Sequence, residues 1–420
     1  MRISILPTLH RRPLFVILAV FLALIEILAR MWGGPPPSLA LIRNPFAAIA
    51  AATVFCRYVI EDRRGPTRKW IVYLSPVTFV AAATIEGSGT FMRLLLLDML
   101  SALGALGVLG FLLAAITADS PQSRDRYIQQ LATALIVPMA ASMASFGLWS
   151  TSAINPVYDG RVYAFEEILG FRFSLLGVQS YRWLPSLSAI ATACYGLLPL
   201  AVALIAAAQQ DRRAEDEVLR ATVFAGGCGF ALYFFCPVAG PLHAFKPAYP
   251  ETLPAISAGW PLITAPIGVP RNGMPSLHTA WALLLCFNSR TLGAAWQWAL
   301  RIFVALTLWA VMGLDDTHWF LDVVVAVPFA VAVQLAFVSS AAQSSRRWID
   351  VAVCSTLTVV WLVGLKTATP LLGLPPVLAW AAVVWTVWWP VTRERAAAHT
   401  GQVTPTLAVA KRATVESLPA

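Results

Sequence analysis

Charged residues are scarce in this 420-residue sequence. Asp, Glu, Lys and Arg make up 12% of it, whereas hydrophobic residues make up 58% and the mean hydropathy is +0.71. A soluble protein of this length could not remove so much apolar surface from water. Cysteine is also sparse, and the six cysteines include no C-x-x-C pair, so neither a zinc site nor a disulfide framework is predicted. No cofactor is expected.

The sequence contains instead a series of long apolar runs. A helix needs about 20 apolar residues to cross a bilayer, and about twelve runs approach that length. They predict an all-α fold, a polytopic transmembrane helical bundle of about twelve helices. The predicted helices are 13–33, 39–56, 70–86, 92–117, 130–152, 184–208, 221–238, 275–288, 296–314, 318–340, 349–366 and 370–390.

Basic residues are distributed unevenly between the connections. Of the 30 lysines and arginines, 21 fall in the two termini and in alternate connections. The positive-inside rule therefore predicts an integral protein of a bacterial inner membrane with both termini in the cytoplasm. This distribution accounts for the net charge of +9 without a nucleic-acid partner, and the bilayer is the expected partner. The sequence leaves the oligomeric state open.

The predicted chemistry divides the chain into four parts. The first consists of accessory transmembrane helices without a chemical motif, and the second is a six-helix core that contains every candidate catalytic residue. Two C-terminal transmembrane helices and a cytoplasmic tail follow. The boundaries are 1–129, 130–342, 343–392 and 393–420.

Histidine is rare, and its placement is informative. The chain has five histidines, of which two fall in the short segments 271–278 and 315–322. Ionisable groups at membrane depth are costly and therefore indicate a functional site. The predicted topology puts both segments at helix ends on the outer side, so we expect them to meet there.

The first segment has the features of a phosphate-binding helix start. Gly273 permits an unusual turn, and Pro275 suits the first turn of a helix. The amides from Ser276 onward would then face a phosphate, with His278 as proton donor and the Arg271 guanidinium as a further ligand. The alternative is a proline-initiated helix with a capping Ser276 and a packed His278.

The second segment contains a histidine and an aspartate four residues apart. This spacing puts His318 and Asp322 on one helix face, so the carboxylate can fix the imidazole tautomer and leave the other nitrogen as a nucleophile or base. One alternative is a buried polar pair that joins helices. Another is a metal site with a second histidine, which we disfavour because no further ligand cluster is apparent, so no metal ligand is predicted.

Pro275-Ser-Leu-His278 and His318-Trp-Phe-Leu-Asp322 resemble the second and third motifs of the type 2 phosphatidic acid phosphatase superfamily. The likeness is closest to its inositol phosphorylceramide synthase-like (inositolphosphotransferase) branch. The resemblance implies a six-helix core and a metal-independent reaction on a lipid phosphate. His318 would form a phosphohistidine, Asp322 would orient it, and His278 would protonate the leaving oxygen and then activate water or an alcohol.

Two basic positions of the superfamily pattern are missing. The first motif usually has a Lys–Arg pair, which is absent from 236–246, and Met312 stands where the third motif has an arginine. The phosphate ligands would then be Arg271 and Ser276, with Lys246 and His243 as substitutes. An ordinary loop role is the alternative for the last two residues.

Four acidic residues lie near these motifs without an assigned role. Asp315 and Asp316 would cap a helix, bind a polar acceptor or hold a cation. Glu166 and Glu167, in the long connection 153–183, would line a head-group entrance or form a solvated face of an interfacial helix, and the solvated face is favoured.

Together these features predict a membrane lipid phosphotransferase or phosphatase. Simple hydrolysis of a lipid phosphate is the nearest alternative. A transporter is another class, but transporters place their sites at broken helices near the midplane, whereas these motifs fall at helix ends. A non-catalytic scaffold is a third class, and the intact His278, His318 and Asp322 argue against it.

Overall fold

In the part of the chain that the computed structural model describes, helices are the regular elements, apart from one isolated bridge between Val157 and Ile263. The predicted all-α class is therefore confirmed. The described residues are 13–31, 36, 44–61, 91–209, 211–245, 249, 262–314, 318–338, 345–368, 371 and 373–416.

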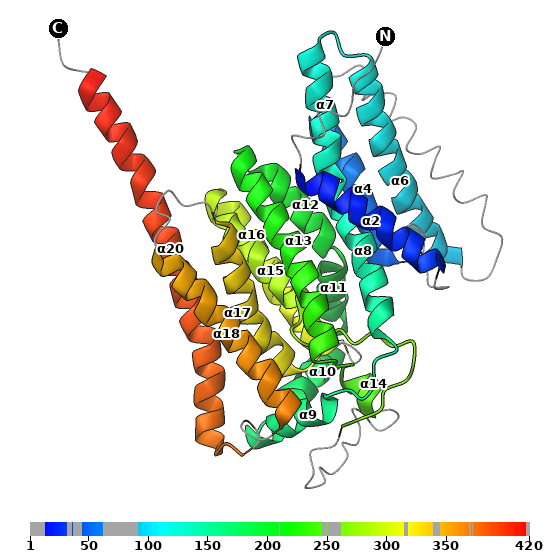
Figure 1. Cartoon of the computed structure of the whole chain (residues 1–420), viewed down its shortest axis with the longest axis vertical. Helices are drawn as coiled ribbons and strands as arrows, with labels where there is room; N and C mark the ends of the chain where they lie inside the picture. The colour runs from blue at the N-terminus through cyan, green and yellow to red at the C-terminus, as the bar shows by residue number, and fades with distance from the viewer. Residues whose placement is uncertain are drawn as a thin grey trace. The chain divides into compact units, whose positions relative to one another are not determined.

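Figure 1 shows the helices in their order along the chain. They are α2 (Pro13–Met31), α4 (Pro45–Glu61), α6 (Phe91–Ile116), α7 (Pro121–Ala134), α8 (Ile136–Thr151), α9 (Asp159–Ile168), α10 (Phe173–Trp183), α11 (Pro185–Gly196), α12 (Leu198–Ala208), α13 (Arg212–Phe235), α14 (Pro241–Phe245), α15 (Leu277–Asn288), the short turn η1 (Ser289–Thr291), α16 (Ala294–Gly313), α17 (Phe320–Phe337), α18 (Ser345–Thr367) and α20 (Pro376–Glu416).

Seven helical spans among the described residues are long and apolar enough to cross a membrane. An eighth is added if α11 and α12, which are bent by 60°, form one broken span. The predicted run 275–288 gives only the 12-residue α15, which is shorter than a full span. The predicted run 70–86 lies outside the described residues. The run 39–56 gives α4, with 17 residues, and the run 370–390 falls largely in α20, and neither helix is among the candidate spans. These four runs separate the observed count from the expected dozen.

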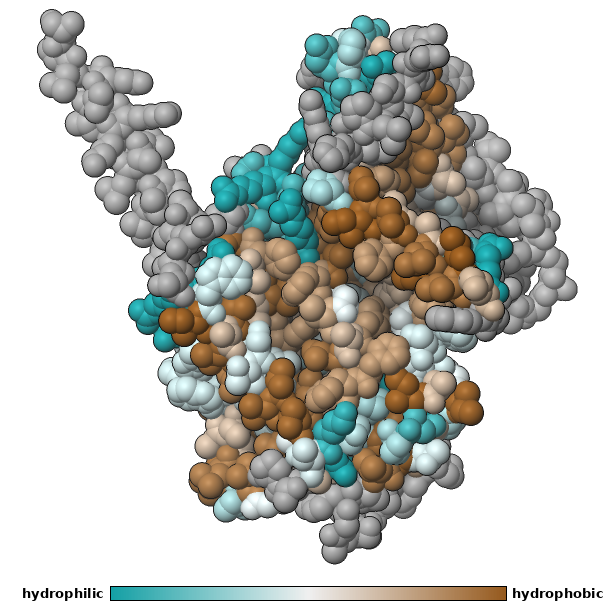
Figure 2. Space-filling model, viewed as in Figure 1, coloured by the Kyte–Doolittle hydropathy of each residue, from teal (hydrophilic) through white to brown (hydrophobic). Residues whose placement is uncertain are grey.

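Apolar side chains remain on the outer surface of several of these spans. Figure 2 shows hydrophobic residues over large areas of the visible face. Ile302 on α16 and Val360 on α18 are 59% and 54% exposed, respectively. Large hydrophobic side chains facing outward are favourable in lipid and costly in water. The chain is thus an integral membrane protein by length and composition of its helices.

The chain forms two compact units. One comprises 1–152, 192–226 and 291–294, and the other comprises 153–191, 227–290 and 295–420. In the first unit, α4 and α6 pack at glycines: a Cβ on Gly104 would lie 2.7 Å from the Ala51 carbonyl oxygen. Small residues permit such close helix packing in membranes.

Helix α17 lies in the core of the second unit, beside α18 and α20 (Figure 1). The apolar stretch of α17 that could cross a membrane is 78% buried inside the protein, the largest fraction among the candidate spans. Helices α9 and α10 cover its first turn, where Phe173 stacks on Phe320 with ring centroids 4.4 Å apart and Tyr163 lies 5.9 Å from Trp319. This packing fixes the start of α17, where His318 is found.

Helix α20 differs from its prediction. It has 41 residues and ends at Glu416, so most of the predicted tail 393–420 continues a helix. The last apolar run of the sequence had suggested an end near residue 390. Three consecutive alanines, Ala396 to Ala398, favour continuation of the helix past residue 393. The division of the chain at 130, 343 and 393 stays a prediction.

Candidate active site

The imidazole of His318 is held by two acceptors at the start of α17. Its Nδ1 lies 3.1 Å from the Gly273 carbonyl oxygen and 3.3 Å from Asp322 Oδ2. Both partners accept only, so Nδ1 carries the proton and Nε2 has the free electron pair. The predicted His–Asp pairing is thus present, and the tautomer suits Nε2 as a nucleophile. The prediction that both residues share one helix face is wrong, because His318 precedes α17.

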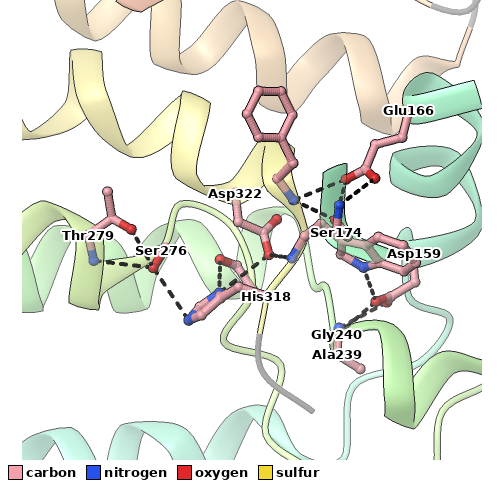
Figure 3. Close-up of polar contacts among 12 residues, drawn as sticks. Asp159, Glu166, Ser174, Ala239, Gly240, Ser276, Thr279, His318 and Asp322 are labelled. Carbon is pink, nitrogen blue, oxygen red and sulfur yellow. Dashed lines mark hydrogen bonds and ion pairs between the residues drawn. The ribbon is translucent and has the colours of Figure 1, made fainter. Parts of the chain in front are cut away.

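Asp322 has a second partner that ties the pair to the helix. The same Oδ2 accepts a hydrogen bond of 2.8 Å from the Trp319 amide, which precedes the first residue of α17. A carboxylate at the third helical position often reaches back to the amide before the helix in this way. The imidazole and the helix start are therefore held by one carboxylate oxygen (Figure 3).

Ser276 faces the other nitrogen of the same ring. Its Oγ lies 3.4 Å from His318 Nε2 and accepts hydrogen bonds from the Thr279 amide and hydroxyl (3.3 and 3.1 Å; Figure 3). Ser276 is the N-cap of α15, so Pro275 precedes the helix rather than filling its first turn. The Ser276 amide donates to the Asp322 carbonyl at 3.2 Å, and the prediction that this amide is available to phosphate is wrong.

His278 lies close to His318, as the convergence of the two segments predicted. The ring centroids are 6.0 Å apart, with the ring planes 65° apart. His318 is buried, at 1% exposed, whereas His278 is only partly buried and also contacts Trp281. The two imidazoles, which come from segments about forty residues apart in the sequence, are therefore neighbours in the structure.

Gly273 is required for space rather than for an unusual backbone angle. Its φ is not positive, unlike those of Gly240 and Gly268. A Cβ on Gly273 would lie 2.5 Å from Val238 Cγ1 and 3.1 Å from Asp322 Oδ2. The predicted reason for this glycine is therefore wrong, and its role is to let two chain segments meet beside the aspartate.

Arg271 is fully buried and surrounded by backbone carbonyls. Its guanidinium donates to the carbonyl oxygens of Ile154 (2.9 Å), Val269 (2.6 Å), Ala265 and Pro266 (both 3.1 Å). These contacts hold the loop that precedes Pro275 and favour a structural role. The predicted role of this arginine as a phosphate ligand gains no support from them.

Of the two other predicted phosphate ligands, His243 and Lys246, the structure describes only His243. His243 is on α14, whose Phe245 packs on Trp319 with centroids 5.7 Å apart. Its phosphate contact stays a prediction. Lys246, Asp315 and Asp316 lie outside the described residues.

Two buried carboxylates that sequence reasoning did not assign to the site support it from α9. Asp159 accepts hydrogen bonds from the Ala239 amide (2.9 Å), the Gly240 amide (2.8 Å) and the Trp319 indole (2.9 Å). Glu166 accepts from the Phe320 amide at 3.0 Å. Figure 3 shows both carboxylates directed at the segment that follows His318.

The environment of these carboxylates contradicts the solvated face that was favoured for Glu166. Asp159 is 0% and Glu166 1% exposed. Burial raises the pKa of Asp159 to about 6 and that of Glu166 to about 7, although their N–H and O–H donors oppose the shift. Glu167 is partly exposed, as predicted for a solvated face, and forms an ion pair with Arg172.

Fold and site together define an integral membrane protein with a buried His–Asp pair at the start of α17. A second histidine lies beside this pair, in the first turn of α15. Residues 160–336 match the family model of the PAP2 superfamily. No curated protein and no solved structure matches the chain. The superfamily resemblance is thereby confirmed over this segment, which contains His278, His318 and Asp322, and the match supports a phosphatase-type enzyme. It does not distinguish the inositol phosphorylceramide synthase-like branch.

Proposed function

We propose that the protein is a membrane lipid phosphatase or phosphotransferase that works through a phosphohistidine on His318. The observation that carries the proposal is the arrangement of two imidazoles with centroids 6.0 Å apart, one of them with its Nδ1 anchored on Gly273 and Asp322. With Nδ1 anchored, Nε2 of His318 is the nitrogen that we propose as the nucleophile, and it lies beside the Ser276 hydroxyl.

In the first step, Nε2 of His318 attacks phosphorus and the bond from phosphorus to the leaving oxygen breaks. His278, in its protonated form, gives its proton to that oxygen. Asp322 stabilises the positive charge that develops on the attacking ring. The Ser276 hydroxyl, 3.4 Å from Nε2 in this structure, turns away from the nitrogen and donates to a phosphoryl oxygen.

In the second step, neutral His278 takes a proton from water or an alcohol. The oxygen of that molecule attacks phosphorus, the nitrogen–phosphorus bond breaks, and His318 is restored. Nucleophile and acid are both side chains of this chain, so we expect activity to persist in the presence of a chelator. No step depends on a cofactor.

The proposed substrate is a lipid with a phosphate in its head group. A site at helix ends in a protein with several membrane spans lets the head group reach the histidines while the acyl chains stay in the bilayer. The distribution of basic residues supports a site on the extracytoplasmic side of a bacterial inner membrane.

The identity of the acceptor distinguishes hydrolysis from transfer. We propose transfer to a polyol or lipid alcohol, which rests on the likeness of Pro275 to His278 to the synthase-like branch and on the missing basic residues of the other motifs. Hydrolysis by water is the second outcome that the experiment separates.

The test offers purified protein phosphatidic acid or a phosphoinositol lipid labelled with ³²P, with and without a polyol acceptor. Released phosphate indicates hydrolysis, and a labelled new product indicates transfer. A phosphoprotein that is labile to acid and stable to base should be trapped during turnover. His318→Ala should abolish the trapped label and lower kcat roughly 10³-fold or more.

His399→Ala is the matched control, because it removes a histidine outside both motifs. It should retain both turnover and the trapped phosphoprotein. Turnover of His318→Ala at the wild-type rate would overturn the assignment of the nucleophile.

A further inference from the structure

We propose that Asp159 and Glu166, here called the α9 carboxylates, are positioning residues that set the location of the His318 imidazole. The proposal rests on the proposed function of His318 and deepens it. Neither carboxylate contacts the imidazole, and each acts through the chain segments on either side of it.

Asp159 accepts hydrogen bonds from two chain segments that lie on different sides of the His318 imidazole. One contact, from the Trp319 indole at 2.9 Å, fixes the residue that follows His318. Its contacts with Ala239 and Gly240 fix the segment whose Val238 carbonyl accepts from the Gly273 amide at 2.9 Å. The Gly273 carbonyl is in turn the closer acceptor for His318 Nδ1.

Glu166 holds the first residue of α17. Its Oε1 accepts from the Phe320 amide at 3.0 Å and from the Ser174 hydroxyl at 2.5 Å. The Ser174 oxygen accepts from the same Phe320 amide at 2.8 Å. This amide has no partner within its own helix, since the first amides of a helix never do. Two oxygens from α9 and α10 therefore determine where α17 begins.

The burial of Asp159 and Glu166 supports a role for both side chains in holding the segments around His318. Charged side chains are rarely buried unless they are paired, and neither carboxylate is paired with a cation in the described contacts. Their partners are backbone and indole N–H groups and a hydroxyl, mostly within two residues of His318 or in the segment that supports Gly273. The neighbouring Glu167 has the ordinary arrangement, an ion pair with Arg172 at the surface.

The test compares Asp159→Asn and Glu166→Gln with the control Glu167→Gln, which makes the same change one residue along the same helix. Each amide keeps the shape of the side chain but replaces one acceptor oxygen by a donor. Displacing a reacting group by about 1 Å costs roughly 100-fold in rate. We expect kcat for dioctanoyl phosphatidic acid to fall roughly 10- to 100-fold in Asp159→Asn and roughly 10-fold in Glu166→Gln, with KM within about 2-fold.

A second readout does not depend on turnover. The chain has five histidines, so ¹⁵N-histidine spectra in detergent are simple, and His318→Ala identifies the resonances of His318. Wild-type protein should show Nδ1 protonated and Nε2 unprotonated. Both α9 variants should shift these resonances, whereas Glu167→Gln should leave them at the wild-type positions.

A third variant guards against simple misfolding. Trp319→Phe keeps an aromatic ring in place but removes the N–H that Asp159 accepts, without changing a buried carboxylate. It should reproduce the change in the His318 resonances in part. Folded Asp159→Asn and Trp319→Phe with wild-type kcat and wild-type His318 resonances would overturn the proposal.

The two proposals fail in different ways. Wild-type turnover in His318→Ala rejects the proposed function but leaves the resonance shifts in Asp159→Asn as a test of positioning. Absent shifts and unchanged kcat in that variant, together with an inactive His318→Ala, reject the role of the α9 carboxylates alone.

Discussion

The missing side chain of Gly273 determines how closely two segments approach beside the aspartate. In Gly273→Ala, the new methyl group would lie 2.5 Å from Val238 Cγ1, so one of the segments must move. Overpacking of this kind costs roughly 1–3 kcal/mol. Because the Gly273 carbonyl also holds His318 Nδ1, we expect a lower melting temperature and at least about a 10-fold loss of kcat.

Gly227→Ala is the control for this substitution. Gly227 lies inside α13, and a Cβ there would meet nothing within 4 Å. Alanine favours helix over glycine by about 1 kcal/mol, so this variant should melt at or above the wild-type temperature and keep its activity. Equal losses in both variants would show that the crowding at Gly273 is unimportant.

The raised pKa of Glu166 predicts how stability depends on pH. The folded protein holds this proton up to about pH 7, whereas an ordinary glutamate loses it near 4.5. The folded state therefore binds more protons than the unfolded state between these values, and the free energy of unfolding falls as pH rises through this window. Asp159, with a pKa of about 6, contributes in the same direction.

Thermal unfolding in detergent from pH 4.5 to pH 8 measures this effect. The wild-type melting temperature should fall through the window and level off above it. Glu166→Gln removes one titrating group, so its melting temperature should change less over the same range. A steeper pH dependence in the variant than in the wild type would contradict the assignment.

At the scale of elements, α17 is the helix on which the site depends. Val325 on α17 is 0% exposed, whereas Val20 on α2 is 63% exposed. Val325→Ala should leave a cavity and destabilise the protein by on the order of 1–3 kcal/mol. Val20→Ala, the same change on an outward-facing surface, should shift the melting temperature by a fraction of that amount.

The elements also show which parts of the site were predictable. The spacing of four predicted that His318 meets Asp322, although His318 lies before α17 and the contact is made across the helix start rather than along a helix face. Asp159 lies 160 residues from its partner Trp319, and no periodicity relates the two. The sequence likewise predicted a solvated position for Glu166, since charged side chains in a connection between helices usually face solvent. Only tertiary packing shows that it is buried.

Arg271 shows a second limit of sequence reasoning, since its role as a phosphate ligand stays a prediction that its observed contacts do not support. An arginine beside a phosphate motif has the fork of donors that phosphate prefers, and the sequence favoured that role. The same fork fits backbone carbonyls, and the loop from Ala265 to Arg271 provides them. Sequence shows the donors of a side chain but not the acceptors that surround it.

At the scale of the whole molecule, the helical class followed directly from composition, whereas the number of spans did not. Apolar runs shorter than a bilayer, such as α15, and broken ones, such as α11 with α12, look like full spans in a sequence window. Where such helices end depends on their neighbours. The match of residues 160–336 to the PAP2 superfamily agrees with the motifs, which lie within that range.

The predicted orientation can be tested in intact cells. With Cys56, Cys194, Cys228, Cys236, Cys286 and Cys354 replaced by alanine, single cysteines would be introduced at Glu167 and at Arg346. A membrane-impermeant maleimide should label position 167 from outside and position 346 only after permeabilisation, since the positive-inside rule puts Arg346 in the cytoplasm. Labelling in the reverse order would invert the topology.

Asp322 Oδ2 accepts from both the His318 ring and the Trp319 amide. The orientation of the His318 ring and the position of the helix start are therefore coupled through one carboxylate oxygen. The ring cannot be re-aimed toward a bulkier head group by a local side-chain change, because that would release the helix start as well. Adaptation to new substrates is therefore expected on the side of His278, since the loop before Pro275 holds the same ring through the Gly273 carbonyl.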